Sequence, residues 1–233
     1  MSYDDIDPTA LPEPEAILFD LDGTLVDTVP IRAESWRRAF REFGMEAPIE
    51  ELGQYMGSDG RWLAGEVGRA HGRELDWVER DALDRSSGDI FSELNRQPAP
   101  LPGATELLTA LEATDRLAYA IATASQPGQV MVSVNSLHLP TEPHITDASH
   151  VKLAKPEPDL LLETARQLGV APGKCWYVGD SRWDMMAGAR AGMIGVAVTT
   201  GATPAQALLE AGATIALPNL LPLLDELRRR ELI

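Results

Sequence analysis

Short apolar segments recur along this sequence, and stretches with helical periodicity separate them. The apolar segments are residues 16–19, 117–122, 175–178 and 194–198. Continuous apolar runs of this length are typical of strands that are buried on both faces of a sheet. One intervening stretch has apolar residues at helical spacing, Leu161, Ala165 and Leu168, with Gly169 as a stop signal. The alternation predicts an α/β fold built on a parallel sheet.

One long stretch contains only helical spacing, for example Trp36, Phe40 and Phe43 ahead of Gly44. The sequence therefore predicts an inserted helical domain. We expect a tail over residues 1–15, an α/β domain over residues 16–30 and 97–233, and an all-helical insert over residues 31–96. Such an insert lies above the carboxyl ends of the strands, where open α/β folds bind ligands.

The charge of the chain narrows the classes of partner. Acidic residues number 36 and Lys plus Arg 20, which gives a net charge of −16. Proteins that grip nucleic acid or anionic membranes need an excess of Lys and Arg, so neither partner is expected. Cys175 is the single cysteine, and the first residues have neither a basic region nor a long apolar run. We therefore expect a cytoplasmic protein; nothing in the sequence indicates its oligomeric state.

Two aspartates follow the first apolar run, in Asp20-Leu21-Asp22-Gly23-Thr24. Residues i and i+2 of an extended chain point the same way, so both carboxylates face one spot. An isolated Asp-Gly pair is most often a surface turn. The whole string has a chance probability of only ~0.005 in a chain of this length, at average residue frequencies. Asp20 and Asp22 are therefore candidate reactive carboxylates.

A second acidic turn follows the run that ends at Val178, in Gly179-Asp180-Ser181-Arg182-Trp183-Asp184. Asp184 lies one helical turn beyond Asp180, so both side chains can face one pocket. Asp180 or Ser181 also suits the N-cap of the following helix. Carboxylates that converge at strand ends repel one another unless a hard cation neutralises them. Oxygen ligands without nearby Cys or His favour Mg²⁺ over zinc.

Hydroxyl, backbone and ammonium donors complete the candidate site. Thr123 and Ala124 follow the run 117–122, although a Thr at a strand end is more often a cap than a ligand. Lys155 precedes Pro156 and a predicted helix, and it is one of three lysines in the chain. A lone lysine is usually a solvated surface charge. Its place before a rigid turn makes Lys155 a candidate anion-binding residue.

Together, Asp20-x-Asp22-Gly23-Thr24, Thr123, Lys155-Pro156 and Gly179-Asp180-Ser181-x-x-Asp184 resemble the four motifs of the haloacid dehalogenase superfamily. The resemblance covers roughly residues 16–217 and is strongest to the branch with a helical cap after the first motif. That branch includes phosphoglycolate phosphatases, sugar-phosphate phosphatases and β-phosphoglucomutases. The implied fold is a modified Rossmann (HAD-like) parallel sheet with helices on both faces plus a small all-helical cap domain.

The resemblance also implies roles for individual residues. Asp20 is expected to attack phosphorus and form an aspartyl-phosphate, and Asp22 to serve as general acid and then as general base. The expected Mg²⁺ ligands are Asp20, Asp22 through its backbone carbonyl, Asp180 and Asp184. The expected phosphate-binding residues are Thr123, Ala124 and Lys155. The implied function is Mg²⁺-dependent hydrolysis of a small phosphorylated metabolite, either a sugar phosphate or a phosphoglycolate-like compound.

Alternatives to a phosphatase remain within this superfamily. A β-phosphoglucomutase-like isomerase is one, although residues 31–96 contain no lysine of the kind that branch uses for substrate contact. A haloacid dehalogenase needs no second aspartate, so the presence of Asp22 disfavours it. A non-catalytic phosphometabolite sensor would be expected to lack one of the motif residues, and all are present.

Substrate specificity is expected to depend on the inserted helices. The candidate specificity residues are Arg32, Arg61 and Trp62. Arg32 stands where many sugar-phosphate members carry His, and it either binds a second anionic group or faces solvent. Arg61 and Trp62 have simpler readings as a surface and a core residue of the insert.

Overall fold

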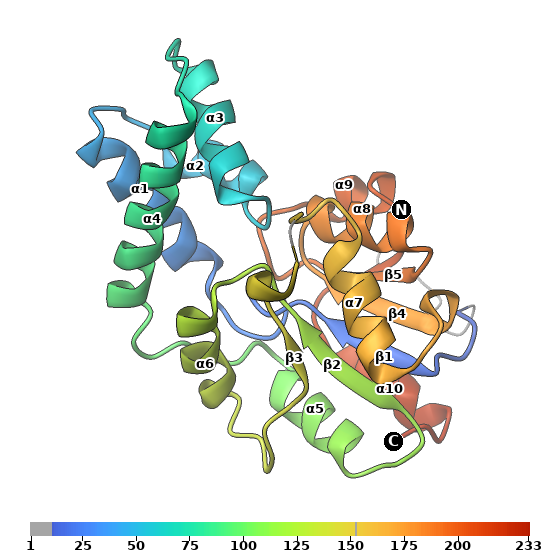
Figure 1. The fold of residues 1–233 in the computed structure, drawn as a ribbon. Coiled ribbons are helices and arrows are strands. Elements are labelled where there is room, and N and C mark those ends of the chain that lie inside the picture. The colour runs from blue at the N-terminus through green and yellow to red at the C-terminus, as the bar shows by residue number, and fades with distance from the viewer. Residues whose placement is uncertain (1–10, 152) are drawn as a thin grey trace.

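A six-stranded parallel sheet forms the centre of the molecule, with the order β3-β2-β1-β4-β5-β6 (Figure 1). The computed structural model describes residues 11–151 and 153–233, so most of the expected tail, residues 1–10, lies outside it. The strands are β1 (Ala16–Phe19), β2 (Ala118–Ala122), β3 (Ile145–Thr146), β4 (Cys175–Gly179), β5 (Ile194–Val198) and β6 (Ala213–Leu217). This confirms the predicted α/β fold with a parallel sheet.

The four apolar runs form β1, β2, β4 and β5, whereas the two edge strands β3 and β6 were not predicted. β3 has only two residues, too few to produce a pattern. β6 has the sequence ATIAL, with the weak strand former Ala at two of five positions. An edge strand has one neighbour and needs less apolar surface than a central one, which explains why the sequence signal is weaker there.

Helices cover both faces of the sheet and form a separate group at one end of it (Figure 1). The α-helices are α1 (Val29–Glu42), α2 (Ile49–Leu52), α3 (Gly60–Ala70), α4 (Trp77–Leu94), α5 (Ala104–Glu112), α6 (Pro127–Ser136), α7 (Asp159–Leu168), α8 (Arg182–Ala191), α9 (Ala205–Glu210) and α10 (Leu221–Arg229). Short 3₁₀ helices accompany them in the described residues, namely η3 (Gly53–Tyr55), η4 (Ala148–His150) and η5 (Pro172–Lys174). α7 ends at Leu168 with Gly169 in the left-handed conformation, as its sequence predicts.

The alternation of side chains along β1 divides the hydrophobic core into two layers. Ile17 and Phe19 belong to a buried cluster with apolar residues of α5, α6 and α10. Ala16 and Leu18 belong to a second cluster, with α7 and α8. Successive side chains of a strand point to opposite faces, so a strand covered on both faces is apolar throughout. All four residues of β1 are fully buried, which holds the residue that follows the strand in a rigid frame.

Helices α1 to α4, which we call the helical insert (residues 29–94), have a hydrophobic cluster of their own that includes Trp36 and Phe40. Two linkers join the insert to the sheet region and run side by side. The Asp27 N–H donates to the Ala99 carbonyl at 2.9 Å, and the Leu101 N–H donates to the Leu25 carbonyl at 2.9 Å. The insert thus joins the remainder of the chain through two paired segments, an arrangement suited to a hinge.

The sheet order decides where the motifs meet. β1 pairs with β2 on one side and with β4 on the other, all in parallel. Their carboxyl ends therefore lie together, with Asp20 after β1, Thr123 after β2 and Asp180 after β4. In the described part of the chain, no helix is both long enough and apolar enough to cross a membrane.

Candidate active site at the carboxyl ends of the strands

Three buried aspartates form the floor of the site. Oxygen atoms of Asp20, Asp180 and Asp184 lie within 4.8 Å of one another, and each residue is at most 5% exposed. The Asp20 N–H donates to the Val178 carbonyl at 2.8 Å, which extends the β1–β4 pairing to the first aspartate. The sheet thereby brings together carboxylates that are 160 or more residues apart in sequence.

The carboxylates of this cluster lack full charge compensation. Burial raises the pKa of Asp20 from 3.8 to about 7; Lys155 opposes the shift, and the charges of Asp184 and Asp22 add to it. Burial and the charges of Asp184 and Asp20 raise the pKa of Asp180 well above its usual value. A bound hard cation would favour the charged form of each. The donor set is all oxygen, which suits Mg²⁺.

Lys155 binds two of the aspartates. Its Nζ lies 2.5 Å from Asp20 Oδ1 and 2.7 Å from Asp184 Oδ1, and the side chain is 2% exposed. Burial lowers the pKa of Lys155, but the charges of Asp184 and Asp20 outweigh burial and the net shift is upward. Lys155 is therefore a buried cation among the aspartates and not a surface charge.

Asp184 is held by several donors. It accepts hydrogen bonds from the Tyr177 hydroxyl at 2.7 Å, from the Ser181 N–H at 3.0 Å and from Ser181 Oγ at 2.5 Å. Ser181 is the N-cap of α8, with Asp184 in a capping box. Asp184 thus orients Lys155 and the start of α8, while Asp180 is free of the capping role. Tyr177 was not predicted, because its own strand gives only an apolar pattern.

The turn after β1 approaches Asp180 closely. Gly23 has φ +84°, and a Cβ atom there would lie 2.5 Å from Asp180 Oδ2. Thr24 Oγ1 donates to Asp180 Oδ1 at 3.1 Å. A larger residue at position 23 would be strained and would also displace the carboxylate. The Gly-Thr pair of the first motif therefore positions the aspartate of the last motif.

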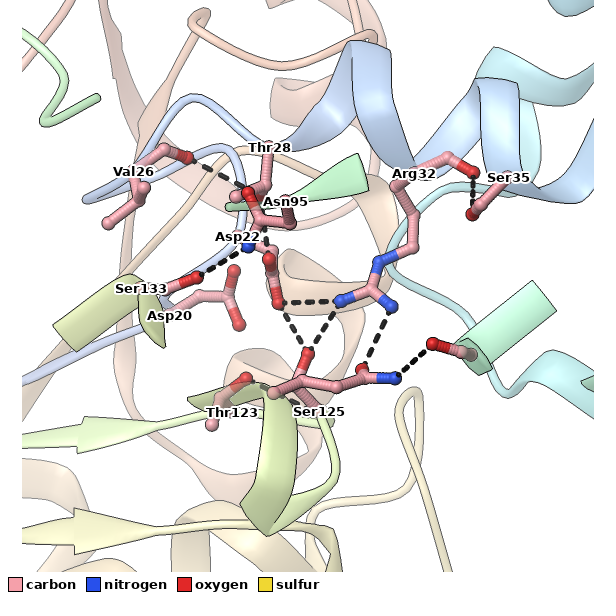
Figure 2. Close-up of polar contacts among 12 residues, drawn as sticks. Asp20, Asp22, Val26, Thr28, Arg32, Ser35, Asn95, Thr123, Ser125 and Ser133 are labelled. Atoms are coloured by element: carbon pink, nitrogen blue, oxygen red, sulfur yellow. Dashed lines mark hydrogen bonds and ion pairs between the residues drawn. The ribbon is translucent and has the colours of Figure 1, made fainter. Parts of the chain in front are cut away.

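Asp22 lies beside Asp20 but has different partners (Figure 2). Its carboxylate accepts hydrogen bonds from Thr28 Oγ1 at 2.6 Å and from Ser125 Oγ at 2.5 Å, and Arg32 Nη2 lies 3.3 Å away. Burial raises the pKa of Asp22, but the Arg32 charge and the two hydroxyl donors outweigh burial and the net shift is downward. The pKa values of these two neighbouring carboxylates thus shift in opposite directions, because only Asp22 has two hydroxyl donors and an arginine beside it.

Arg32 extends from α1 of the helical insert into this network. Besides Asp22, its guanidinium donates to Ser125 Oγ at 2.9 Å and to Gln129 Oε1 at 3.0 Å, and it lies 3.4 Å from the centre of the Phe91 ring. Its side chain is 19% exposed. Arg32 lines the cavity and contacts the Asp22 carboxylate, and its expected role in substrate specificity stays a prediction. Gln129 was not predicted, because contacts across the two parts of the chain leave no local signal.

A cavity of about 720 Å³ opens above the aspartates. Predicted site residues that line it are Asp20, Asp22, Arg32, Arg61, Thr123, Ala124, Lys155 and Asp180. Thr123 is buried, and its Oγ1 accepts a hydrogen bond from the Ser125 N–H at 3.1 Å.

Trp62 does not line this cavity, in contrast to the expectation that it contacts substrate. Its ring packs against Trp183 of α8 with centroids 4.8 Å apart. Trp62 follows the start of α3, so its position along the helix directs it to the sheet domain. Its place in the structure is a contact between the helical insert and the loop that carries Asp180.

Comparison with known proteins gives the class to which this fold and site belong. The model of the family "Haloacid dehalogenase-like hydrolase" matches residues 17–198. Hexitol phosphatase A of Escherichia coli (strain K12) is 31% identical over 199 residues, with 81% of this chain and 84% of the relative covered. A phosphoglycolate phosphatase of Mesorhizobium japonicum is 30% identical over 191 residues, with 80% and 83% covered.

A solved structure, described as a hydrolase from Pseudomonas syringae, superposes with a TM-score of 0.85 at 28% identity. The match covers 93% of this chain and 98% of that one. The chain belongs to the haloacid dehalogenase-like hydrolases. This confirms the family, the HAD-like fold and the hydrolase class that the four motifs predict.

Proposed function

We propose that this protein is a Mg²⁺-dependent phosphatase that hydrolyses a small phosphomonoester through an aspartyl-phosphate intermediate. The observation that carries the proposal is the position of Asp20. Its carboxylate contacts Lys155 and lies within 4.8 Å of the carboxylates of Asp180 and Asp184, in a cavity that Asp22 also lines. A nucleophile, a neighbouring acid–base group and a fixed cation are the elements of in-line phosphoryl transfer.

The metal ligands are proposed from the donor set. Asp20 and Asp180 contribute carboxylate oxygens, the Asp22 backbone carbonyl adds a third oxygen, and Asp184 supports them from behind Lys155. A bound Mg²⁺ would supply charge neutralisation for the phosphate and for the carboxylates. The positive charge of Lys155 compensates only part of the negative charge of the aspartates. Mg²⁺ would offset the remaining negative charge so that a phosphate can bind.

The first chemical step belongs to Asp20. An Oδ atom of Asp20 attacks phosphorus, and the bond between phosphorus and the leaving oxygen breaks. Lys155 Nζ stabilises the phosphoryl oxygens by charge, while the Thr123 hydroxyl and the Ala124 N–H donate hydrogen bonds to them. These donors are positioned before substrate arrives, because Lys155 and Thr123 are both almost fully buried.

Asp22 manages the protons of both steps. In its protonated form it donates a proton to the leaving alkoxide; as the carboxylate so formed, it accepts a proton from the water that attacks the aspartyl-phosphate. Thr28, Ser125 and Arg32 hold the carboxylate in one orientation beside Asp20. The helical insert covers the site and excludes bulk water from the first step.

The comparisons support a small phosphorylated metabolite as substrate. The two relatives named above are phosphatases of a hexitol phosphate and of phosphoglycolate by their names. Both names describe monophosphates of small organic molecules, and the cavity of about 720 Å³ has ample room for such a compound.

Phosphate release from a panel of phosphorylated metabolites, with and without Mg²⁺, tests the proposal. We expect phosphate release with Mg²⁺ and loss of release when Mg²⁺ is chelated. In Asp20→Asn we expect kcat to fall on the order of 1000-fold or more. Asp115→Asn is the matched control and should retain activity, because Asp115 is exposed and precedes the amino end of β2, at the opposite end of that strand from Thr123. Activity that is independent of divalent metal, or near-wild-type release by Asp20→Asn, would contradict the proposal.

A further inference from the structure

The cavity above Asp20 continues into the helical insert, and its far wall has a distinct chemistry. The residues of that wall include Asp59, Gly60 and Arg61 at the start of α3, and Asp81, Asp84 and Arg85 on α4. None of them belongs to the four sequence motifs. A phosphate occupies only the floor of the cavity, so this wall faces the remainder of a substrate.

The arginines of the far wall already have carboxylate partners. Arg61 Nε lies 3.4 Å from Asp81 Oδ1 and 3.8 Å from Asp84 Oδ2, and Arg85 pairs with Asp81. Arg32, which lines the cavity nearer its floor, is engaged by Asp22. A carboxylate or second phosphate on a substrate would therefore have to compete with existing partners for each guanidinium.

Asp84 differs from the other groups of this wall. Its carboxylate accepts no hydrogen bond from the residues that the structure describes, and its side chain is 35% exposed in the cavity wall. Gly60 makes room for it, because a Cβ atom at position 60 would lie 2.7 Å from Asp84 Cγ. Apart from the Arg61 Nε atom at 3.8 Å, which is beyond hydrogen-bond distance, the Asp84 carboxylate thus presents its acceptor oxygens to the cavity.

Asp84 and Asp59 line the same cavity as Asp20, and charged groups of the insert surround Asp84. Burial and the charge of Asp59 raise the pKa of Asp84, while the charges of Arg61 and Arg32 oppose this shift. Arg32 is the same residue that contacts Asp22. A phosphomonoester bound at Asp20 would extend from the floor of this cavity toward the wall that holds Asp84 and Asp59.

We propose that Asp84 is a specificity-determining residue that accepts hydrogen bonds from hydroxyl groups of the leaving alcohol, and that Asp84 and Asp59 together repel anionic leaving groups. The substrate class that follows is an uncharged, polyhydroxylated monophosphate, namely a sugar or sugar-alcohol phosphate. Phosphoglycolate and bisphosphates are disfavoured, because each would bring a second anion against two carboxylates. This inference rests on the proposed phosphatase function.

A comparison of kcat/KM for two phosphomonoesters tests the inference. The probes are a hexitol 6-phosphate and 2-phosphoglycolate, with p-nitrophenyl phosphate as a general substrate of the reaction centre. We expect the wild-type kcat/KM to favour the hexitol phosphate about tenfold or more, since one hydrogen bond to a charged group has that effect. Asp84→Asn should reduce this ratio about tenfold, because it keeps the shape and removes the charge.

Two further variants make the result specific. Glu93→Gln changes the same charge on the exposed face of α4 and should leave the ratio unchanged. Asp59→Asn should reduce the ratio in the same direction as Asp84→Asn, since Asn still caps α3 in place of Asp59. It therefore provides an independent measurement if Asp84→Asn does not fold.

The possible outcomes separate the two proposals. A wild-type preference for 2-phosphoglycolate, or a ratio unchanged in both Asp84→Asn and Asp59→Asn, overturns the inference about substrate class while p-nitrophenyl phosphate hydrolysis upholds the phosphatase function. If none of the three compounds is hydrolysed with Mg²⁺ present, the phosphatase function fails and the inference fails with it.

Discussion

Arg32 Nη2 lies 3.3 Å from Asp22 Oδ2, so a cation from the helical insert is held against the carboxylate beside Asp20. Gln129 Oε1 accepts from Arg32 at 3.0 Å, and Gln129 Nε2 donates to the Gly88 carbonyl of α4 at 3.1 Å. The position of the insert and the orientation of Asp22 are therefore linked through one set of hydrogen bonds.

Replacement of Arg32 tests this link. Arg32→Met removes the charge that lowers the Asp22 pKa, so burial raises that pKa and the acid limb of the kcat profile moves to higher pH. We expect kcat to fall about tenfold or more on loss of a charge-assisted hydrogen bond. Arg38→Met, on the exposed face of the same helix, is the control. A raised KM with unchanged kcat and pH profile would show instead that Arg32 binds substrate.

The buried aspartates predict a link between metal, pH and stability. Because the Asp20 pKa is raised from 3.8 to about 7, the folded state without metal retains a proton that the unfolded state releases. The free energy of unfolding should therefore fall as pH rises from about 4 to about 7. Mg²⁺ at 100 times its Kd should add about 2.7 kcal/mol at neutral pH.

Urea unfolding at pH 5 and at pH 8, with and without Mg²⁺, measures both effects. Asp180→Asn should reduce the stabilisation by Mg²⁺, because it removes one of the proposed carboxylate ligands. Equal stabilisation of this variant and the wild type would argue against the proposed metal site.

Removal of Lys155 should affect both folding and catalysis. Lys155→Met leaves Asp20 and Asp184 without their buried cation, and such a loss costs about 3–5 kcal/mol. The double variant Lys155→Met/Asp184→Asn should recover part of the stability but none of the activity. Thermal unfolding and phosphate release distinguish the two effects. Lys174→Met, at an exposed ion pair with Glu15, should change neither; a fully stable Lys155→Met would show that the pair is not needed for folding.

Glu226 of α10 predicts a contribution to acid stability. Hydrogen bonds from Arg229 and Arg230 lower its pKa from 4.5 to about 2, against the effect of burial. The stabilisation is present above pH 4.5 and should be lost as pH falls toward 2, so Glu226→Gln should be less stable at pH 7 by about 1–2 kcal/mol.

Salt provides the control for this prediction. Glu163 pairs with Arg166 at the surface, where salt screens the interaction. In about 1 M salt the Debye length is about 3 Å, so the loss of stability caused by Glu163→Gln should vanish. Glu226 is 6% exposed, and its effect should persist. Equal salt sensitivity of the two variants would show that burial of Glu226 does not matter.

The sequence by itself determined the alternation of strands and helices and the residues at the strand ends. A fully buried strand must be apolar, so the polar residues that interrupt the pattern, Asp20, Thr123 and Asp180, are visible as exceptions. Because parallel neighbours end at one edge of the sheet, those exceptions also predict a common site.

Only the tertiary structure decided the partners of those residues. Arg32 contacts Asp22, and Tyr177 donates a hydrogen bond to Asp184. Both contacts join residues from separate elements, and no local pattern specifies such pairs. The position of Asp84 in the cavity wall likewise depends on how the insert packs. The tertiary structure also decided the edge strands β3 and β6. Each forms by pairing with a neighbouring strand, although its own sequence pattern is weak. Periodicity in the sequence indicates on which face of a helix or strand a side chain lies. The packing of the helical insert over the sheet decides which residues that side chain contacts.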